Sequence, residues 1–588
     1  VDEVIGSLTE SFKSAVFEVG VTNLDAILAF DADTDNKFDP PGYEINTGLT
    51  PVYLTMDSSL IRAQGMLDIN IFDSIILSGS IAFELGPTED VTLSDNGTAT
   101  VTTLTIGGAD INAFVGVDGP YWSLERDAAG NGDGKFDENE KDPNAVGFHV
   151  TNLDFGLMVM AEVDIVGSTP SLGVYLAGKL NVDTFGLVGV PDLTAEGAFD
   201  IELNVGFGAD GLSASFAPVD FEASFSEAVT LFNLLDANKD NVIDEGEQNA
   251  AFKDGYRGVA GEAGAEIIDP QSLFEFLNAS AYFDDLDTDN SGQVEDDELV
   301  GYTGEPIGSP GDLIVVLNAG NGPPIDKFLT MIELKAQLDA SYVSTKLTAI
   351  NNLDADNNDR INTGFEVNTG NSDSPVILDF TEFFISIRLG GEIELTDVFR
   401  MDGVFLFEAD ENGLKAFVAA GLEIGPDVGS DDNNKIFRMN ALGALVINGD
   451  GVAADINVSV AIGGSVSDVV QLEANARLVF NTTSAPQVIE IPEKYVKFLV
   501  GESAVPDSLD FDTEQVDGLT VARADLTTRF PGLDLNGDGS ATYTIPGGAP
   551  KAGGGFEANG TYVLATFDAN LIVLDLFEID ASFRVLLS

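Results

Sequence analysis

The sequence predicts a mainly β protein, with several antiparallel β-sandwich or open-barrel-like modules built from repeated hairpins and one inserted helical segment. Three observations carry this prediction. Apolar and polar residues alternate over long stretches, one hairpin pattern recurs along the chain, and helix-like runs are concentrated at about residues 221–304. Alternation with a period of two indicates strands that bury one face.

The stretch from Ala63 to Phe83 shows the alternation most clearly. Its apolar face consists of Ala63, Gly65, Leu67, Ile69, Ile71, Ile75, Leu77, Gly79, Ile81 and Phe83. The break at residues 72–74 predicts a tight turn, so this stretch is a predicted hairpin. Similar hairpins are centred on Asp73, Asp397, Asp468 and Asp575, and a looser copy with an insertion follows Asp183.

A small residue stands in the middle of the apolar face in each clear copy of this hairpin. These residues are Gly79, Gly403, Ala474 and Ala581. Small side chains in a strand interior suggest that another sheet or backbone approaches closely there. The irregular spacing of the copies indicates degenerate duplication with insertions rather than a strict solenoid.

Composition excludes several classes of function. The formal net charge is −73, which excludes nucleic acid as a partner and disfavours direct attachment to an anionic membrane. The chain has no cysteine, so thiol catalysis and zinc–thiolate sites are excluded. Its one histidine, His149, lies in a strand-like run, and a histidine-based zinc site needs more than one. We expect no direct membrane insertion, because no apolar run reaches about 20 residues.

Two segments carry oxygen-bearing residues at positions 1, 3, 5, 7, 9 and 12 of a calcium-binding loop. Alternate side chains can wrap one hard cation, and a carboxylate at position 12 supplies two oxygens. The second segment also has the glycine, Gly292, expected at the sharp turn. The ligands are Asp236, Asn238, Asp240, Val242, Asp244 and Glu247 in the first, and Asp287, Asp289, Ser291, Gln293, Glu295 and Glu298 in the second.

Four further segments are variants of the same pattern. In two of them the closing glutamate is late, in one the opening aspartate needs a local bulge, and in the last Ile545 stands at position 12. The alternative is that Asp, Asn and Gly simply favour turns. The candidate ligands are Asp31, Asp33, Asp35, Lys37, Asp39 and Glu44; Asp354, Asp356, Asn358, Arg360, Asn362 and Glu366; Asp127, Asn131, Asp133, Lys135, Asp137 and Glu140; and Asp534, Asn536, Asp538 and Ser540.

These patterns divide the chain into four predicted parts. Ser226 is a predicted cap for the helix that enters the first complete loop. We also expect residues 328–350 to form a strand. The parts are 1–220, β modules with two calcium loops; 221–305, a helical EF-hand-like pair; 306–483, a repeated β module with a calcium loop; and 484–588, a linker and a terminal β module with a calcium loop.

The combination of alternating β segments with loops such as Asp31–Glu44, Asp127–Glu140, Asp354–Glu366 and Asp534–Thr542 resembles the repeat regions of very large secreted bacterial surface proteins of the adhesin type. Their calcium loops are EF-hand-like or dockerin-like. The resemblance implies an extracellular or cell-surface location and a role as a stalk, adhesin or protective coat. It also implies several Ca²⁺ ions that make the array rigid.

We therefore expect a non-enzymatic, calcium-stabilised structural protein of the cell surface, a subunit of a filament, sheath, stalk or adhesin. The terminal segments Ala15–Val21 and Ser582–Leu587 are strand-like, so self-association by strand addition is the expected partnership. Two alternatives stay open. One is a calcium-dependent module that binds surface glycans through Tyr121 and Trp122, and the other is a polysaccharide-active enzyme with two carboxylates.

Overall fold

The computed structural model of the 588-residue chain falls into two compact units, Val1–Ile61 with Leu85–Pro87 and Arg62–Glu84 with Thr88–Ser588. Of the first unit it describes the antiparallel pair β1 (Tyr43–Ile45) and β2 (Val52–Leu54). The structure describes residues 43–45, 52–54, 61–122, 142, 144–166, 169–207, 217–239, 242–252, 267, 272–273, 276–277, 329–351, 353, 360–371, 374–396, 398–426, 428, 435–464, 467, 469–499, 526, 529–536, 540–551, 555–574 and 576–588.

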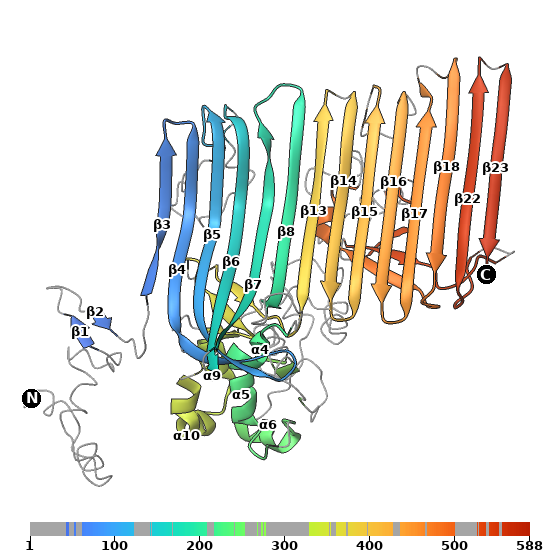
Figure 1. The fold of residues 1–588 in the computed structure, drawn as a ribbon. Coiled ribbons are helices and arrows are strands. Elements are labelled where there is room, and N and C mark those ends of the chain that lie inside the picture. Colours follow the sequence, from blue (N-terminus) through green and yellow to red (C-terminus); the bar gives the residue numbers. More distant parts are fainter. Residues whose placement is uncertain are drawn as a thin grey trace, which may run out of the picture. The chain divides into compact units, whose positions relative to one another are not determined.

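One sheet of fourteen strands dominates the second unit, in the order β23-β22-β18-β17-β16-β15-β14-β13-β8-β7-β6-β5-β4-β3 (Figure 1). From β5 to β23 every neighbouring pair is antiparallel. The strands are β3 (Ile61–Ile71), β4 (Ile75–Thr92), β5 (Thr98–Val117), β6 (Val146–Val166), β7 (Thr169–Val188), β8 (Leu193–Phe207), β13 (Phe384–Leu395), β14 (Phe399–Asp410), β15 (Gly413–Ile424), β16 (Phe437–Asn448), β17 (Gly451–Ile462), β18 (Val470–Asn481), β22 (Tyr562–Val573) and β23 (Phe577–Leu587).

The predicted fold class is confirmed, because the chain is mainly β and its sheets are antiparallel. The hairpin predicted around Asp73 is β3–β4, and Phe72 and Asp73 both take positive φ in its turn. The looser copy after Asp183 differs from the prediction. Asp183 lies inside β7, beside a register shift, and the chain turns instead in the insertion between β7 and β8.

The predicted hairpins join one continuous sheet. Two long insertions interrupt it, one between Phe207 and Phe384 and the other between Asn481 and Tyr562, and the strands on either side of each insertion still pair directly. Sequence alternation is a local signal and does not say which strands are neighbours. Backbone hydrogen bonding across the insertions is what unites the hairpins.

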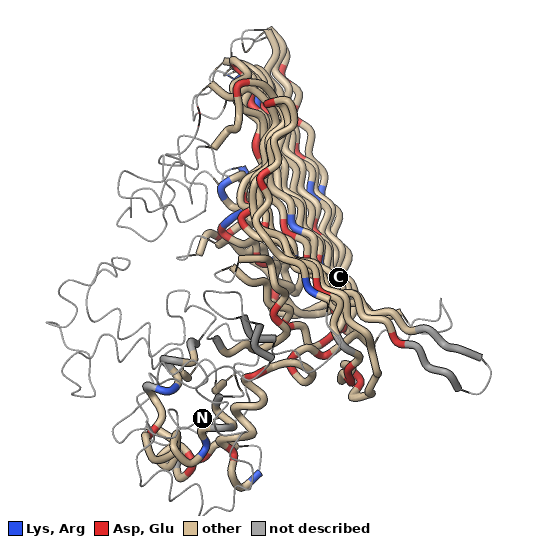
Figure 2. The backbone as a smooth tube through the Cα atoms, turned by 90° about the vertical axis from the view of Figure 1, so that its left-hand side faces the viewer, with Lys and Arg blue, Asp and Glu red and all other residues tan. Residues whose placement is uncertain are grey.

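The second insertion covers one face of β13 to β18 and β22. It contributes β19 (Gln487–Ile491), α11 (Glu493–Val496), β20 (Leu533–Leu535) and β21 (Ala541–Ile545), and the order in its own sheet is β19-β21-β20. Tyr495, Phe498 and Tyr543 from this insertion pack in one core with Phe417 and Leu442 of the large sheet. Figure 2 views the large sheet nearly edge-on, with the described covering segments to the left of its strands.

Part of the first insertion covers the same face of β5 to β8. Its elements are α4 (Phe221–Phe225), β11 (Phe365–Val367) and β12 (Val376–Leu378). Phe221 and Leu378 are buried in a core with Met158 and Met160 of β6. The backbone approaches closely here, because a Cβ at Gly107 of β5 would lie 2.3 Å from the carbonyl oxygen of Asn368. Only glycine leaves that space.

Charged side chains on the covered face are paired beneath the second insertion. Arg529 donates to both carboxylate oxygens of Asp402 at 2.7 Å and to the carbonyl of Leu499 at 2.7 Å. Arg477 binds both oxygens of the buried Asp455 at 3.0 and 2.6 Å. Burial lowers the pKa of the Arg477 guanidinium, but the contacts with Asp455 outweigh it and the net shift is upward.

The rest of the first insertion forms a helical region with its own core. Its elements are α5 (Glu227–Leu235), α6 (Glu245–Ala251), β9 (Leu329–Thr330), α9 (Met331–Gln337), α10 (Ala340–Asn351) and β10 (Arg360–Ile361). The expected strand at 328–350 is wrong, because α9 and α10 occupy almost all of it. Leu334 and Ile350 pack against Leu231 and Phe232 of α5, so tertiary packing selects helix for this ambiguous apolar run.

None of the described helices has both the length and the hydrophobicity that a membrane-spanning helix needs.

Candidate functional site

The first complete calcium-loop pattern lies between two helices. The side chain of Ser226 accepts a hydrogen bond from the Val229 N–H and caps α5, as predicted, and Asp236 ends this helix. Asp244 and Glu247 form a reciprocal capping box that begins α6. The local sequence therefore places the loop in a helix–loop–helix unit, which is the setting that a calcium loop of this kind requires.

Two carboxylates of this loop, those of Asp236 and Glu247, accept hydrogen bonds from the loop's own backbone. Asp236 is 3 % exposed, and one of its carboxylate oxygens accepts from the Lys239 N–H at 2.7 Å. Glu247 bends back across the loop, where its two oxygens accept from the N–H groups of Asn238 at 3.0 Å and Asp244 at 3.1 Å. Glu247 stands at position 12 and contacts the backbone at positions 3 and 9. Its carboxylate therefore lies where a calcium loop needs a ligand with two oxygens.

The residue at position 8 of this loop joins it to a second segment. Ile243 is fully buried and forms an antiparallel bridge with Ile267, with N–H to carbonyl distances of 2.8 and 3.2 Å. The sequence around Ile267 lacks the alternating acidic pattern, since Ala260 and Gln271 stand at the corresponding positions 1 and 12. The bridge therefore pairs a ligand-rich loop with a segment that cannot supply the same ligand set.

One of the variant loops behaves in the same way at position 8. Ile361 is fully buried and pairs with Leu329 in the short sheet of β9 and β10. Leu353 at the start of this loop and Ile361 share one hydrophobic core with Leu235 and Ile243 of the first loop. The structure thus places residues of the loop at Asp236 and residues beside Asp354 in one core, while the loop at Asp287, its predicted partner, lies outside the described residues.

The closing part of the variant loop contains a buried amide oxygen that lacks a donor. Asn362 is 3 % exposed, and its Nδ2 donates to Glu366 at 3.0 Å, but its Oδ1 has no hydrogen-bond partner. Buried polar atoms are normally satisfied, and an ion is one accepted explanation of an exception. The sequence assigned both Asn362 and Glu366 as calcium ligands.

Glu227 joins this group from the first turn of α5, and sequence reasoning missed it. One of its carboxylate oxygens accepts from the Asn362 N–H at 3.3 Å, and the Ala228 N–H and the Ser226 hydroxyl donate to the Asn362 carbonyl at 3.1 and 3.2 Å. No sequence signal links Glu227 to Asn362, because these residues are 135 positions apart. The side chains of Glu227, Asn362 and Glu366 therefore lie close together, the first from α5 and the other two from the closing part of the variant loop.

A tyrosine joins the two helices that lead into these loops. Tyr342 of α10 donates its hydroxyl proton to the carbonyl of Leu234 in α5, two residues before Asp236. Burial, and secondarily the negative charge of Glu247, raise the pKa of Tyr342. This hydrogen bond fastens α10, which precedes the variant loop, to the end of α5, which precedes the first loop.

The remaining predicted ligands divide into two groups. Asp534 is exposed in β20, Asn536 and Ser540 hydrogen-bond each other across the β20–β21 turn, and Ile545 is buried in β21, so this segment is a hairpin connection. Glu44 lies in β1 and Arg360 in β10, and their side chains are not described. The other candidates outside the described residues are Asp31, Asp33, Asp35, Lys37, Asp39, Asp127, Asn131, Asp133, Lys135, Asp137, Glu140, Asp240, Asp287, Asp289, Ser291, Gln293, Glu295, Glu298, Asp354, Asp356, Asn358 and Asp538.

The donor set of both loops consists of carboxylate, amide and carbonyl oxygens, which suits a hard cation such as Ca²⁺ and not a thiolate-seeking metal. Within the described ranges, no three acidic or histidine side chains converge closely enough to hold a metal ion by themselves. The side chains of Asp240, Asp354 and Asp356, which the pattern requires, fall outside those ranges. Glu247 and Asn362 are the described residues whose geometry fits the ion best.

The aromatic pair considered for sugar binding is not accessible. Trp122 is 2 % exposed, and Tyr121 packs with it in a small core that includes Phe114. The Tyr121 ring lies 4.2 Å from the ring of His149, which is also buried. A sugar-binding platform needs an exposed aromatic face, so Tyr121 and Trp122 do not provide one.

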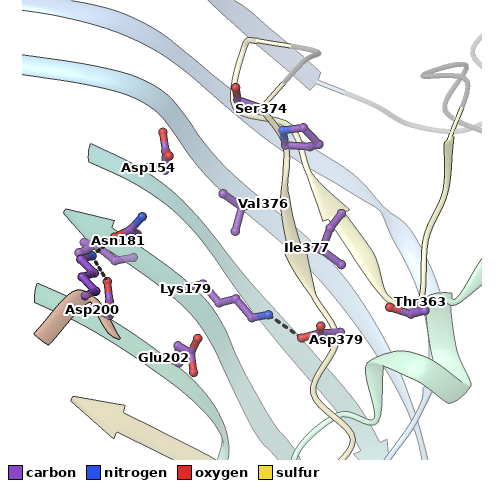
Figure 3. A pocket seen from close by; sticks show the side chains of 13 residues that line it. Asp154, Lys179, Asn181, Asp200, Glu202, Thr363, Ser374, Val376, Ile377 and Asp379 are labelled. Atoms are coloured by element: carbon purple, nitrogen blue, oxygen red, sulfur yellow. Dashed lines mark hydrogen bonds and ion pairs between the residues drawn. The ribbon is translucent and has the colours of Figure 1, made fainter. Parts of the chain in front are cut away.

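A polar cleft of about 530 Å³ lies between the two covering insertions, on the face of β6 to β8 (Figure 3). Two ion pairs cross it. Lys179 of β7 binds Asp379 at 2.5 Å, and Lys494 of α11 binds Asp200 of β8 at 2.7 Å. These contacts hold the insertions to the sheet, and they use two of the carboxylates in the cleft.

The other cleft carboxylates are also engaged. Glu202 lies 3.6 Å from the Arg388 guanidinium, and Asp154 accepts from the Asp110 N–H at 2.8 Å. Tyr495 donates to Asp200 at 2.5 Å, and burial followed by this contact raises the pKa of Tyr495 well above its ordinary value. The cleft carboxylates are therefore each engaged with a cation, a tyrosine hydroxyl or a backbone N–H.

No protein-family model, curated protein or solved structure matches this chain.

Proposed function

We propose that the chain is a calcium-stabilised structural protein of the cell surface, a subunit of a filament, sheath, stalk or adhesin, and not an enzyme. The observation that carries this proposal is the shared core of the loops at Asp236 and Asp354, with the unsatisfied Asn362 oxygen beside Glu227 and Glu366. An ion bound there would neutralise acidic groups and connect α5 with β11.

The physical role of calcium follows from mass action. An ion that binds only the folded state stabilises that state by about 2.7 kcal/mol when its concentration is 100 times Kd. Millimolar external calcium would occupy even extracellular-type loops with Kd of about 10⁻⁴ M to a useful degree. The net charge of −73 supports an environment rich in cations, because self-repulsion opposes a compact fold.

Removal of calcium is expected to lower the melting temperature of the full chain by roughly 3–5 °C, as two sites are emptied. Differential scanning calorimetry in 2 mM Ca²⁺ and in excess chelator would measure this change, with magnesium added to the chelator as the control for ionic strength. An identical melting curve in both buffers, together with no calcium binding by titration calorimetry, would exclude calcium stabilisation.

Self-association through terminal strands belongs to the same proposal. β23 is exposed along all eleven residues and forms one edge of the sheet, while β3 forms the other. β3 and β23 run in opposite directions (Figure 1), as alternation over fourteen strands requires. A second copy in the same orientation could therefore add its β3 to β23 as an antiparallel pair. The segment Ala15–Val21 lies outside the described residues.

Deletion of residues 577–588 is expected to abolish end-to-end assembly. It leaves thirteen strands, so the two edges then run in the same direction and the antiparallel match is lost. Negative-stain electron microscopy and sedimentation would compare this variant with the full chain and with a chain that lacks the first twenty residues. Polymers that persist after both deletions would show that neither terminal segment is the contact.

A further inference from the structure

The face of the large sheet opposite the insertions is apolar without interruption from β13 to β23. The paired registers place only apolar residues and glycine on it. The strands β14 and β15 at its centre contribute Phe399, Met401, Gly403, Phe405 and Phe407, and Ala416, Val418, Ala420, Leu422 and Ile424. We call the surface formed by these eight strands the open face.

None of the described elements covers the open face. Leu389, Phe405, Val418 and Ile456 are 41–49 % exposed, whereas Phe417 on the covered side is 1 % exposed. An apolar depression of about 580 Å³ lies on the same side of the large sheet, from β6 to β15; it contains Phe185 of β7 and reaches Leu389 and Val418 of the open face. Adjacent residues of one strand, such as Phe417 and Val418, therefore have opposite environments.

The area of the open face exceeds what a soluble chain leaves in water. Eight strands about 4.8 Å apart, each of about twelve residues rising about 3.4 Å, cover roughly 1,500 Å². Exposed apolar patches on monomers reach about 300–600 Å², and larger ones indicate an interaction site. A standard protein interface buries about 800 Å² per partner, so the open face is on the scale of an obligate interface.

The charge and shape of the chain favour a second copy as the occupant. A partner must be apolar over the same area, and the open face of an identical chain meets this condition. In such a pair, the side of each chain that carries the insertions still faces water. With a net charge of −73, the chain is repelled by anionic lipid surfaces. The strands from β13 to β23 run side by side with little fanning (Figure 1), and wide sheets of low twist are typically stabilised by stacking.

The small residues in the repeated hairpins also favour a second copy of the chain as the partner of the open face. Gly403, Ala474 and Ala581 lie on the open face, where a Cβ at Gly403 would meet only the neighbouring strand, at Ala419 and Ala420. Their small side chains leave shallow depressions in the surface between larger side chains such as Leu389 and Met401. Facing sheets about 10 Å apart interdigitate large and small side chains in this manner.

We propose that two copies of this chain pack open face against open face and form a β-sandwich between chains. The sandwich that the sequence predicts within one chain is then completed by dimerisation, with the same surface used on both copies. This inference does not depend on calcium, so its test can be carried out both in calcium and in chelator.

Val418→Glu tests the proposal, because it introduces a charge at the centre of the open face. On dilution, the smallest wild-type species in analytical ultracentrifugation should be a dimer of the 61.9-kDa chain. The variant should be a monomer with a dimer Kd raised at least about 100-fold, since a buried unpaired charge is strongly disfavoured. Leu347→Glu, on an exposed position of α10 outside the sheet, is the matched control and should remain dimeric.

A cysteine-labelling experiment protects the test against misfolding of the charged variant. The chain has no cysteine, so Ala420→Cys and Leu347→Cys each place one thiol, at the open face and at α10. A bulky maleimide should modify Ala420→Cys at least 100-fold more slowly than Leu347→Cys. Equal labelling rates would overturn the proposal, as would a wild-type monomer that binds phosphatidylcholine vesicles or a Val418→Glu variant that stays dimeric.

Discussion

Replacement of Arg529 by alanine is expected to lower the free energy of unfolding of the sheet by about 3–5 kcal/mol. Arg529 is the cation that pairs with both carboxylate oxygens of Asp402, and Asp402 is fully enclosed between β14 and the second insertion. Removal of the guanidinium leaves the buried Asp402 carboxylate with only the longer, 3.8 Å contact to Arg400, and it also removes the donor to the Leu499 carbonyl. The loss should appear as a lower urea midpoint in circular dichroism.

Lys415→Ala is the matched control for this prediction. Lys415 binds Glu408 at 2.7 Å, but both side chains are substantially exposed, so water replaces the lost contact and the expected cost is below about 1 kcal/mol. A double variant, Arg529→Met with Asp402→Leu, should recover much of the stability because it leaves no unpaired charge. If Arg529→Ala and Lys415→Ala had the same midpoint, the buried pair would not be what anchors the insertion.

Glu247→Gln is expected to weaken calcium binding at the first loop on the order of 100-fold, equivalent to about 2.8 kcal/mol. Glu247 supplies both oxygens at position 12, and an amide offers one weaker oxygen in place of two charged ones. The capping geometry of α6 is largely kept, because glutamine can also accept from the Asp244 N–H. Titration calorimetry of the full chain should show one site fewer at calcium concentrations that fill the wild-type protein.

Glu245→Gln provides the comparison, because it removes the same charge two residues earlier, at loop position 10 where no ligand is expected. Its calcium affinity should change by less than about threefold, the size of a screened long-range effect. Equal losses in the two variants would mean that net charge, and not ligation by Glu247, governs binding. An unchanged stoichiometry in Glu247→Gln would remove the loop at Asp236 from the set of calcium sites.

Much of the local structure could be read from the sequence. Alternation over Ala63–Phe83 predicted β3, β4 and their turn, and Ser226 was correctly assigned as the cap of α5. These features depend on residues close together in the chain, where strand period and capping chemistry act directly. The run at 328–350 was misassigned as a strand. An apolar segment of this kind is compatible with both the helix and the strand period, and its packing against α5 decides between them.

The candidate site was only partly predictable for the same reason. Spacing alone identified Asp236 through Glu247 and Asn362 with Glu366, since loop ligands are close in sequence. Glu227 was missed, because its contact with Asn362 exists only after α5 and the variant loop pack together. The pairing of Ile243 with Ile267 was missed too, since Ile267 lies in a segment without ligands.

The sequence by itself determined the mainly β class, the hairpins with their small central residues and the oxygen-rich loops, because each of these features depends on residues that are close together in the sequence. Only the tertiary structure decided that the hairpins form one sheet across two insertions, which loops share a core, and that one apolar face stays uncovered. These outcomes depend on contacts between residues far apart in sequence. Alternation specifies that a strand has an apolar face, but it does not specify what will cover that face.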